Sequence, residues 1–299
     1  MKPPSSNGYS RPVTEACEQV LVTLLSGLGP WKESVVLVGG LTPRYLVTRK
    51  PPEVREHAGT GDVDLVVDFG VLADTKAYST LQENLEGLGF ERTVKNGSKQ
   101  NWRWSIRTPN DIEIIIEFLS DNPEVKGGAL KELPTKGRLS AVNIPHASIV
   151  SDLNDQIEVT ADSLKTGART TEVVAHANIV SFVCLKAFAF EHRREPKDAH
   201  DLVYCLENFD GEPPAVDQFK VALEGQHGQV IDKALKVLVT RFTDPVPEEA
   251  YMRDGPTAVG VFEVSEQDGD EDVREQRILV QRNAQQTVGT FLKALGYAP

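Results

Sequence analysis

Asp62 and Asp64 have the residue type and the spacing of a divalent-metal site. They lie in the segment GDVDLVV, in which acidic and apolar residues alternate from Gly61 onward. Side chains of a β-strand point alternately to opposite faces, so the pattern predicts a strand with both carboxylates on one face. Two neighbouring carboxylates repel each other unless a cation or a basic side chain lies between them. Mg²⁺, or Mn²⁺ in its place, is such a cation, and the alternative is two acids on the solvent face of an edge strand.

A third carboxylate is expected in the apolar segment 111–119, whose sequence is DIEIIIEFL. Alternation places Glu113 and Glu117 on the face opposite the core. Glu117 is the favoured metal ligand, because an acid among isoleucine, phenylalanine and leucine is costly to place unless its charge is used. Glu113 is the reserve, and an ordinary solvent-facing acid is the alternative for both residues.

Gly39 and Gly40 follow a short β-branched run and precede a proline, which predicts a strand, a tight turn and a helix start. Glycine lets backbone N–H groups approach an anion, and a helix N-terminus favours negative charge. Thr42 adds a hydroxyl and Arg44 a fork of donors. We therefore expect this turn to hold a triphosphate.

Arg193, Arg194 and Lys197 form a dense basic cluster near an acidic site. Lys186 and Arg193 are seven residues apart, on one face of an expected helix, and Lys197 and Asp198 begin the next one. Lys186 lies in an otherwise apolar helix, which favours a functional role for its charge. The alternative to a functional role is a structural one, in which these residues cap a helix-turn-helix. Lys197 and Asp198 would then form a surface ion pair that contributes little to stability.

The elements that must position these residues form two expected domains. Residues 13–165 predict a mixed α/β domain with a small mixed sheet, and residues 166–299 predict a helical C-terminal domain, with the active site in the cleft between them. The elements of the first domain are a helix at 13–28, a strand at 34–38, a helix from 42 or 43 to 47, strands at 62–69, 90–94, 102–107 and 111–119, a helix at 73–88, and strands at 137–144 and 156–160. The second domain has expected helices at 173–192, 197–209, 215–223, 229–242 and 276–295, and the acidic stretch 265–275 is expected to be a solvated loop or helix entry.

The order of strand, Gly39-Gly40, helix, Asp62-x-Asp64 and a later strand acid resembles the nucleotidyltransferase superfamily related to DNA polymerase β. The stretch 185–202, LKAFAFEHRREPKDAHDL, resembles the Lys-Ala, Arg and Lys/Arg-Asp-x-x-Asp-Leu motif of AbiEii-like and MenT-like proteins. Those proteins are toxins of type IV toxin–antitoxin and phage-defence systems, and some transfer nucleotides to the 3′ end of tRNA. The resemblance implies that Lys186 contacts nucleotide phosphates and that Asp198 lies at the active site. Leu41 departs from the family pattern, which has a small hydroxyl residue directly after the glycines.

The predicted function is metal-dependent transfer of a nucleoside monophosphate from an NTP, such as ATP or GTP, to an acceptor, which the resemblance implies is tRNA. The resemblance also implies a toxin role and a cognate antitoxin partner. The alternatives are a small-molecule enzyme of the aminoglycoside type, a CCA-adding enzyme and a nonenzymatic nucleotide-binding protein. The predicted site consists of metal ligands Asp62, Asp64 and Glu117, further catalytic residues Lys186 and Asp198, and nucleotide-binding residues Gly39, Gly40, Thr42, Arg44, Thr60, Arg193 and Lys197.

The composition restricts where the protein acts and what it binds. The formal net charge of the 299 residues is −12, so a nucleic-acid acceptor would have to meet a local basic patch. A cationic or small acceptor is equally compatible with that charge. The sequence has no apolar run long enough for a signal peptide or a membrane span, and a cytoplasmic location is expected. Three widely spaced cysteines, Cys17, Cys184 and Cys205, predict reduced core thiols.

Overall fold

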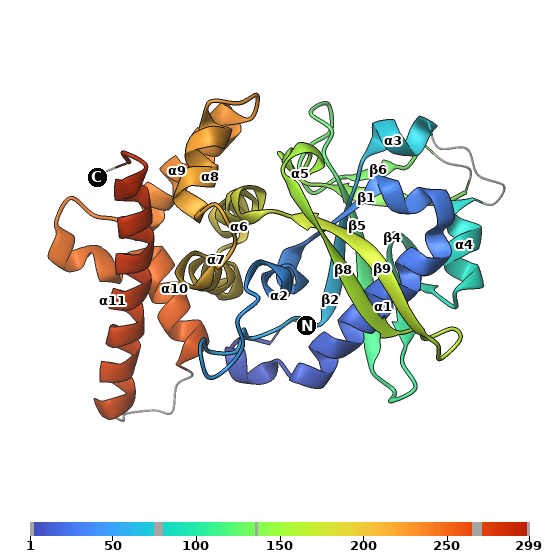
Figure 1. Cartoon of the computed structure of the whole chain (residues 1–299), viewed down its shortest axis with the longest axis horizontal. Coiled ribbons are helices and arrows are strands. Elements are labelled where there is room, and N and C mark those ends of the chain that lie inside the picture. Colours follow the sequence, from blue (N-terminus) through green and yellow to red (C-terminus); the bar gives the residue numbers. More distant parts are fainter. Residues whose placement is uncertain (1–2, 75–79, 135–136, 265–270, 298–299) are drawn as a thin grey trace. The chain divides into compact units, whose positions relative to one another are not determined.

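The computed structural model describes residues 3–74, 80–134, 137–264 and 271–297. The chain forms two compact units, and both are discontinuous in sequence. The sheet unit consists of residues 10–42 and 59–178, and the helical unit of residues 1–9, 43–58 and 179–299. The protein is therefore mixed α/β, with a mixed sheet and a helical part, as the sequence predicts (Figure 1).

The sheet unit is built on one mixed nine-stranded sheet. Seven of its strands follow the order β3-β4-β5-β2-β1-β9-β8, and β7 joins β5 while pairing with β6. Pairing is parallel between β2 and β5, between β1 and β9 and between β5 and β7, and antiparallel elsewhere. The strands are β1 (Val35–Val38), β2 (Asp62–Val67), β3 (Glu91–Lys95), β4 (Ser98–Arg107), β5 (Glu113–Ser120), β6 (Leu130–Glu132), β7 (Ser140–Asn143), β8 (Asn154–Asp162) and β9 (Arg169–Ala177).

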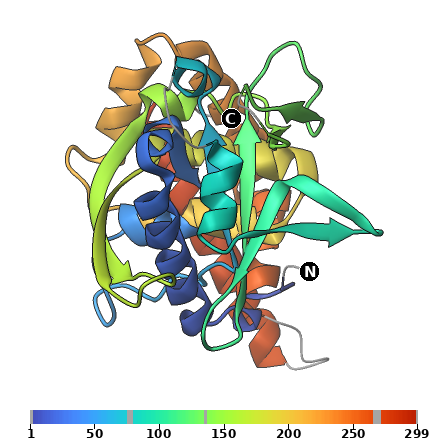
Figure 2. The ribbon, with the colours of Figure 1, turned by 90° about the vertical axis from the view of Figure 1, so that its right-hand side faces the viewer.

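Helix α1 (Arg11–Leu28) covers one face of this sheet and contacts β2, β5, β8 and β9. Figure 2 shows α1 beside α4 (Leu81–Gly87), in front of the strands. Alternation along each strand sends one set of side chains into this core, and the Trp104 side chain of β4 is completely buried there. The acidic residues of β2 and β5 alternate with the core residues and therefore belong to the opposite face.

Short helical segments connect the strands of the sheet unit. A capping box starts α4, because Thr80 accepts a hydrogen bond from the backbone of Glu83 while the Glu83 side chain accepts one from the backbone of Thr80. The remaining segments are the 3₁₀ turns η2 (Gly29–Ser34) and η3 (Gly39–Leu41) and the helices α3 (Phe69–Asp74) and α5 (Ile149–Asp152).

In the described residues, the helical unit is formed by α-helices and by two 3₁₀ turns. Its central pair is α6 (Ile179–Arg193) and α7 (Pro196–Asn208), which contact each other. The proline at the first position of α7 suits a helix start, because its missing N–H has no intrahelical partner there. The other segments are η1 (Ser6–Gly8), α2 (Pro43–Leu46), α8 (Ala215–Leu223), α9 (Gly228–Phe242), η4 (Pro247–Met252), α10 (Asp254–Glu263) and α11 (Glu271–Ala294).

Residues 43–58 belong to the helical unit although they lie between two strands of the sheet unit in sequence. Side chains and backbone groups of this segment form hydrogen bonds with α7 and with the residue Asp210 after it. His57 Nε2 lies 2.8 Å from Asp201 Oδ1, and the Tyr204 hydroxyl donates to the carbonyl of Arg55 at 3.1 Å. The backbone N–H of Thr48 donates to Asp210 Oδ1 at 3.0 Å. These contacts explain why the boundaries of the units differ from a single break near residue 165.

Several expected elements are corrected by the structure. The expected helix from residue 173 is wrong over residues 173–177, which form the end of β9 and pair with β8 and β1. Residues 98–101 and 130–132, where no strand was expected, form the start of β4 and the strand β6. The expected helix at 73–88 divides into α3 and α4, and residues 75–79 lie outside the described part of the chain. The 3₁₀ turn η4 and helix α10 were not expected, and residues 265–270 of the acidic stretch are also outside the described part.

The three cysteines are free and buried in helices, which confirms the expectation of core thiols. Cys17 belongs to α1, Cys184 to α6 and Cys205 to α7. Burial raises the pKa of each of these thiols, so they are held in the protonated form. In the described segments, every helix is too short or too polar to cross a membrane.

Candidate active site

The predicted metal-binding carboxylates lie on adjacent strands of the sheet unit. Asp64 of β2 is the register partner of Glu117 of β5, and Asp62 lies opposite Ile115. Register partners on neighbouring strands point to the same face and are separated by about 5 Å. The three acids are therefore brought together on one face, as predicted. Glu113 lies at the start of β5, is exposed, and has Arg107 of β4 as its partner.

Gly39 lies directly against the carboxylate of Asp64. It follows Val38, the register partner of Asp64 on β1, and has a φ of +76°. A Cβ atom added to Gly39 would lie 2.0 Å from Asp64 Oδ2, closer than any side chain can come. Only glycine fits this position, both because of its backbone conformation and because of the neighbouring carboxylate. The structure thus joins the Gly-Gly turn to the acidic face.

Asp62 receives a hydrogen bond from the residue that precedes the strand. The Thr60 hydroxyl donates to Asp62 Oδ1 at 2.7 Å, and Thr60 is itself buried. Thr14 of α1 holds the backbone of Thr60, since its hydroxyl accepts from Thr60 N at 3.1 Å. Thr60 was predicted to bind nucleotide, and in the structure its hydroxyl is directed to the carboxylate.

Glu117 forms an ion pair with Arg103, its register partner on β4. Arg103 Nε lies 3.0 Å from Glu117 Oε1, but the N–H is not aligned for a hydrogen bond. A misaligned pair keeps the Coulomb attraction and lacks the directional part of the bond. Arg103 therefore places a cationic side chain next to Glu117, and sequence reasoning did not single out this residue.

The turn after β1 differs from the expected helix start. Gly39 to Leu41 form a 3₁₀ turn, and α2 has only four residues, so the expected contribution of a helix dipole is small. Thr42 is completely buried, and its hydroxyl has no hydrogen-bond partner among the described residues. Arg44 lies in α2 and belongs to the helical unit. Of the residues predicted to bind the triphosphate, the Gly39-Gly40 turn is therefore the part that lies beside the carboxylates.

The donor set of the acidic face fits a hard divalent cation. Asp62, Asp64 and Glu117 offer oxygen atoms from two adjacent strands, and Mg²⁺ prefers such ligands. Gly39 leaves free the space beside Asp64 that a side chain would fill. These residues would hold the ion.

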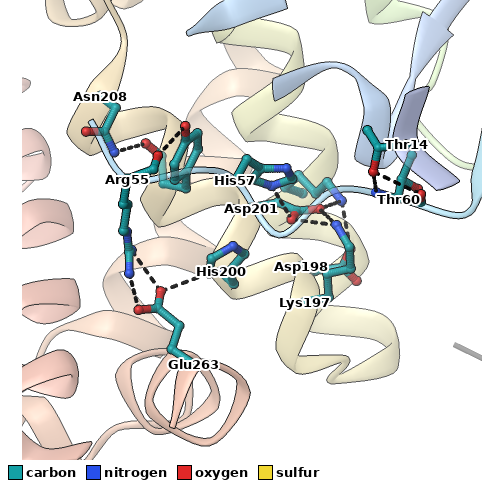
Figure 3. Close-up of polar contacts among 12 residues, drawn as sticks. Thr14, Arg55, His57, Thr60, Lys197, Asp198, His200, Asp201, Asn208 and Glu263 are labelled. Carbon is teal, nitrogen blue, oxygen red and sulfur yellow. Dashed lines mark hydrogen bonds and ion pairs between the residues drawn. The ribbon is translucent and has the colours of Figure 1, made fainter. Parts of the chain in front are cut away.

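The helical unit contains the second group of predicted residues as a buried charge cluster. Lys186 Nζ lies 3.2 Å from Asp198 Oδ1 and 2.6 Å from Asp201 Oδ2. Arg193 approaches Asp198 with two nitrogens, at 2.6 and 2.8 Å. Lys197 donates to both oxygens of Asp201, at 2.7 and 2.9 Å (Figure 3). The structure thus brings Lys186, Arg193, Lys197 and Asp198 together within this unit.

The pKa values of the cluster follow from burial and charge pairing. Burial alone lowers the pKa of Lys186, but the carboxylates of Asp201 and Asp198 outweigh burial, and the pKa is raised. Burial alone raises the pKa values of both aspartates, and the neighbouring cations reverse the direction. All these groups are therefore charged at neutral pH.

Asp201 and His57 complete the cluster, and sequence reasoning gave neither of them a role. Asp201 is completely buried and binds Lys186, Lys197 and His57. The four-residue spacing of Lys197 and Asp201 on a helix is a signal that could have identified the aspartate. His57 is far away in sequence and carried no such signal.

His57, His200 and Asp201 are close enough together to share a metal ion, because one ligand atom of each lies within 4.8 Å of the others. The charges oppose such an ion. Asp201 already binds the ammonium groups of Lys186 and Lys197, and a divalent cation beside them would meet two like charges in a buried site. The acidic face of the sheet unit fits a metal better.

Comparison with solved structures finds a distant similarity. A crystal structure described as an antigenic nucleotidyltransferase-like protein from Paracoccidioides brasiliensis is similar to this chain, with a TM-score of 0.43 and 15% sequence identity, over 81% of this chain and 93% of that chain. No protein-family model matches the sequence, and no curated protein matches it.

Proposed function

We propose that this chain is a metal-dependent nucleotidyltransferase whose metal ligands are Asp62, Asp64 and Glu117. One observation carries the proposal: the Asp64 carboxylate lies beside Glu117 and directly against the Gly39 turn. A glycine turn next to a carboxylate face offers backbone donors for phosphates and oxygen ligands for a cation in one place. Glu117 is preferred to Glu113 because it is the register partner of Asp64.

In the proposed reaction, an acceptor hydroxyl oxygen attacks the α-phosphorus of a nucleoside triphosphate. A new phosphorus–oxygen bond forms, the bond to the bridging oxygen of the β-phosphate breaks, pyrophosphate leaves, and the hydroxyl proton is released. When bound, Mg²⁺ neutralises charge on the phosphoryl oxygens. The protein residues position the reactants: Gly39 and Gly40 accommodate the triphosphate, and the three carboxylates fix the cation beside it.

The proposed acceptor is tRNA, and the proposed biological role is that of a toxin with a cognate antitoxin. This part of the proposal rests on the resemblance of residues 185–202 to AbiEii-like and MenT-like proteins. The roles that the resemblance implies for Lys186, Arg193, Lys197 and Asp198 stay predictions. Incubation with labelled NTPs and either tRNA or an aminoglycoside separates the two acceptor classes, because only the true acceptor becomes labelled.

Asp64→Asn tests the core of the proposal. The amide keeps the shape of the side chain and removes the charge that the metal needs. Metal stabilisation of the transition state is worth several kcal/mol, and each 1.36 kcal/mol is tenfold in rate, so transfer should fall by about 100-fold or more. The measurement is release of pyrophosphate and labelling of the acceptor at fixed Mg²⁺.

Glu113→Gln is the matched control, because it makes the same change at an exposed acid of the same sheet. It should leave transfer within about threefold of the wild type, as expected for a surface substitution that costs under about 0.5 kcal/mol. Wild-type activity in Asp64→Asn would refute the proposed metal site. Calorimetry that shows Mg²⁺-dependent triphosphate binding without turnover on any acceptor would favour the nonenzymatic alternative.

A further inference from the structure

Thr14 and Thr60 form a buried pair that links helix α1 to the start of β2. The Thr14 hydroxyl accepts a hydrogen bond from Thr60 N at 3.1 Å and lies 3.3 Å from the Thr60 carbonyl oxygen (Figure 3). The side chains are 46 positions apart in sequence, and both residues are buried, with exposed fractions of 8% and 2%. A single hydroxyl of α1 therefore fixes the backbone that leads into the acidic strand.

The backbone around this pair is fitted closely to the Thr14 side chain. Gly59 has a φ of +90°, and a Cβ atom at this position would lie 2.2 Å from the Thr14 hydroxyl oxygen. Only glycine allows both this conformation and this approach. The fit is a second observation, independent of the hydrogen bonds, that the two segments are held in one arrangement.

The fixed backbone places the Thr60 hydroxyl against the first predicted metal ligand. This hydroxyl donates to Asp62 Oδ1 at 2.7 Å. A hydroxyl has a single hydrogen, which rotates toward an acceptor within reach, so the position of the Thr60 backbone decides which acceptor the hydroxyl can reach. The bond leaves the other carboxylate oxygen, Oδ2, with a fixed orientation on the acidic face.

We infer that Thr14 is a positioning residue of the metal site and acts through Thr60 on the Asp62 carboxylate. The inference rests on the proposed function, because it takes Asp62 as a metal ligand. Residues that orient a metal ligand commonly change metal affinity by about 10- to 100-fold when they are removed. Thr14 touches neither the metal nor the substrate in this account.

The test is the affinity of the purified full chain for Mn²⁺ alone, measured by calorimetry for the wild type and for Thr14→Val and Thr14→Ser. Valine has the shape of threonine without its hydroxyl, so the Mn²⁺ affinity should fall by about 10- to 100-fold. Serine keeps the hydroxyl and should restore the affinity to within about threefold of the wild type. Wild-type affinity in Thr14→Val would overturn the inference.

Thr23→Val is the matched control. Thr23 lies in the same helix, is completely buried, and accepts a hydrogen bond from Leu164 N at 2.8 Å, so the same change removes a buried hydroxyl elsewhere in the sheet unit. Its Mn²⁺ affinity should stay at the wild-type value although the thermal stability falls. Equal losses of Mn²⁺ affinity in Thr14→Val and Thr23→Val would show a general structural effect and would overturn the inference.

Thr60→Val gives a second route if Thr14→Val does not fold, because it removes the hydroxyl that donates to Asp62. Thr60→Val should weaken Mn²⁺ binding by itself. Where Thr14→Val also folds, the losses of Mn²⁺ affinity in the double variant should not multiply. Unchanged affinity in Thr60→Val, or independent losses, would overturn the inference. Asp64→Asn distinguishes failure of the proposed function from failure of this inference. If the wild type and Asp64→Asn bind Mn²⁺ equally, the proposed function fails. If Asp64→Asn loses Mn²⁺ affinity and the Thr14 variants keep it, only the inference about Thr14 fails.

Discussion

At the scale of single residues, Gly39 connects the turn after β1 to the acidic face. Its φ of +76° and its contact with Asp64 are two separate reasons for glycine at this position. An alanine would bear backbone strain of about 1–2 kcal/mol and would also push the carboxylate out of place. The second effect is the one that bears on function.

We expect Gly39→Ala to weaken Mn²⁺ binding and to reduce nucleotidyl transfer by about 100-fold, as Asp64→Asn does, because the added methyl group displaces the Asp64 carboxylate. The measurement is Mn²⁺ affinity by calorimetry together with the transfer rate. Gly97→Ala is the matched control: Gly97 has the same φ of +76°, but a Cβ atom there would have nothing within 4 Å. If both variants lose metal affinity equally, backbone strain is the cause and the contact with Asp64 is irrelevant.

At the scale of elements, α6 and α7 hold their charged side chains in the interior. Lys186 of α6 reaches two aspartates of α7, and all three side chains are at least nine-tenths buried. Without Lys186, each aspartate keeps one cationic partner, Arg193 or Lys197, and loses one buried charge-assisted hydrogen bond. Such a hydrogen bond contributes about 1.5–3 kcal/mol. The pair therefore bears on the stability of the helical unit, whatever further role its residues have.

Lys186→Met should lower the free energy of unfolding of the helical unit by about 1.5–3 kcal/mol, because Asp198 and Asp201 each lose a buried charge-assisted hydrogen bond. Lys236→Met makes the same change in α9, where the side chain is 68% exposed and pairs with Asp232, and should cost at most about 1 kcal/mol. Urea unfolding followed by circular dichroism at 222 nm measures both. Equal effects of the two variants would contradict a structural role of the buried cluster.

At the scale of the whole molecule, the charge distribution makes stability depend on pH. The chain has a net charge of −12, yet it buries His57 beside the cationic Lys197. Burial lowers the pKa of His57 from 6.5 to about 4, and the attraction of Asp201 does not offset it. The native protein therefore keeps this imidazole neutral where the unfolded chain protonates it.

The free energy of unfolding should fall as the pH drops below about 6.5. The reason is that His57 binds a proton near pH 6.5 in the unfolded chain but only near pH 4 in the native protein. From pH 7 to pH 5 the loss attributable to His57 is about 2 kcal/mol. Urea unfolding at the two pH values measures it, and His57→Gln should show a smaller difference between them. An equal pH dependence in His57→Gln and the wild type would mean that other groups cause the effect.

Local patterns in the sequence already determine one part of the site. Alternation in residues 61–67 is enough to place Asp62 and Asp64 on one face, because the side-chain period of a strand is a local property. Alternation also predicts core positions for residues 112, 114, 116 and 118. The structure buries Ile114, Ile116 and Phe118 completely, whereas Ile112 is half-buried and precedes β5. Helical periodicity likewise predicted α1, α7 and α9 to within a few residues.

Only the tertiary structure decided which residues meet across elements. Strand register brings Asp64 next to Glu117, 53 positions away in sequence, and next to Gly39. The packing of α1 on the sheet brings Thr14 to Thr60. Residues 173–177 fit the period of a helix, but they form a strand because they pair with β8 and β1. Local periodicity determines which face a side chain occupies, whereas long-range pairing determines which side chain faces it.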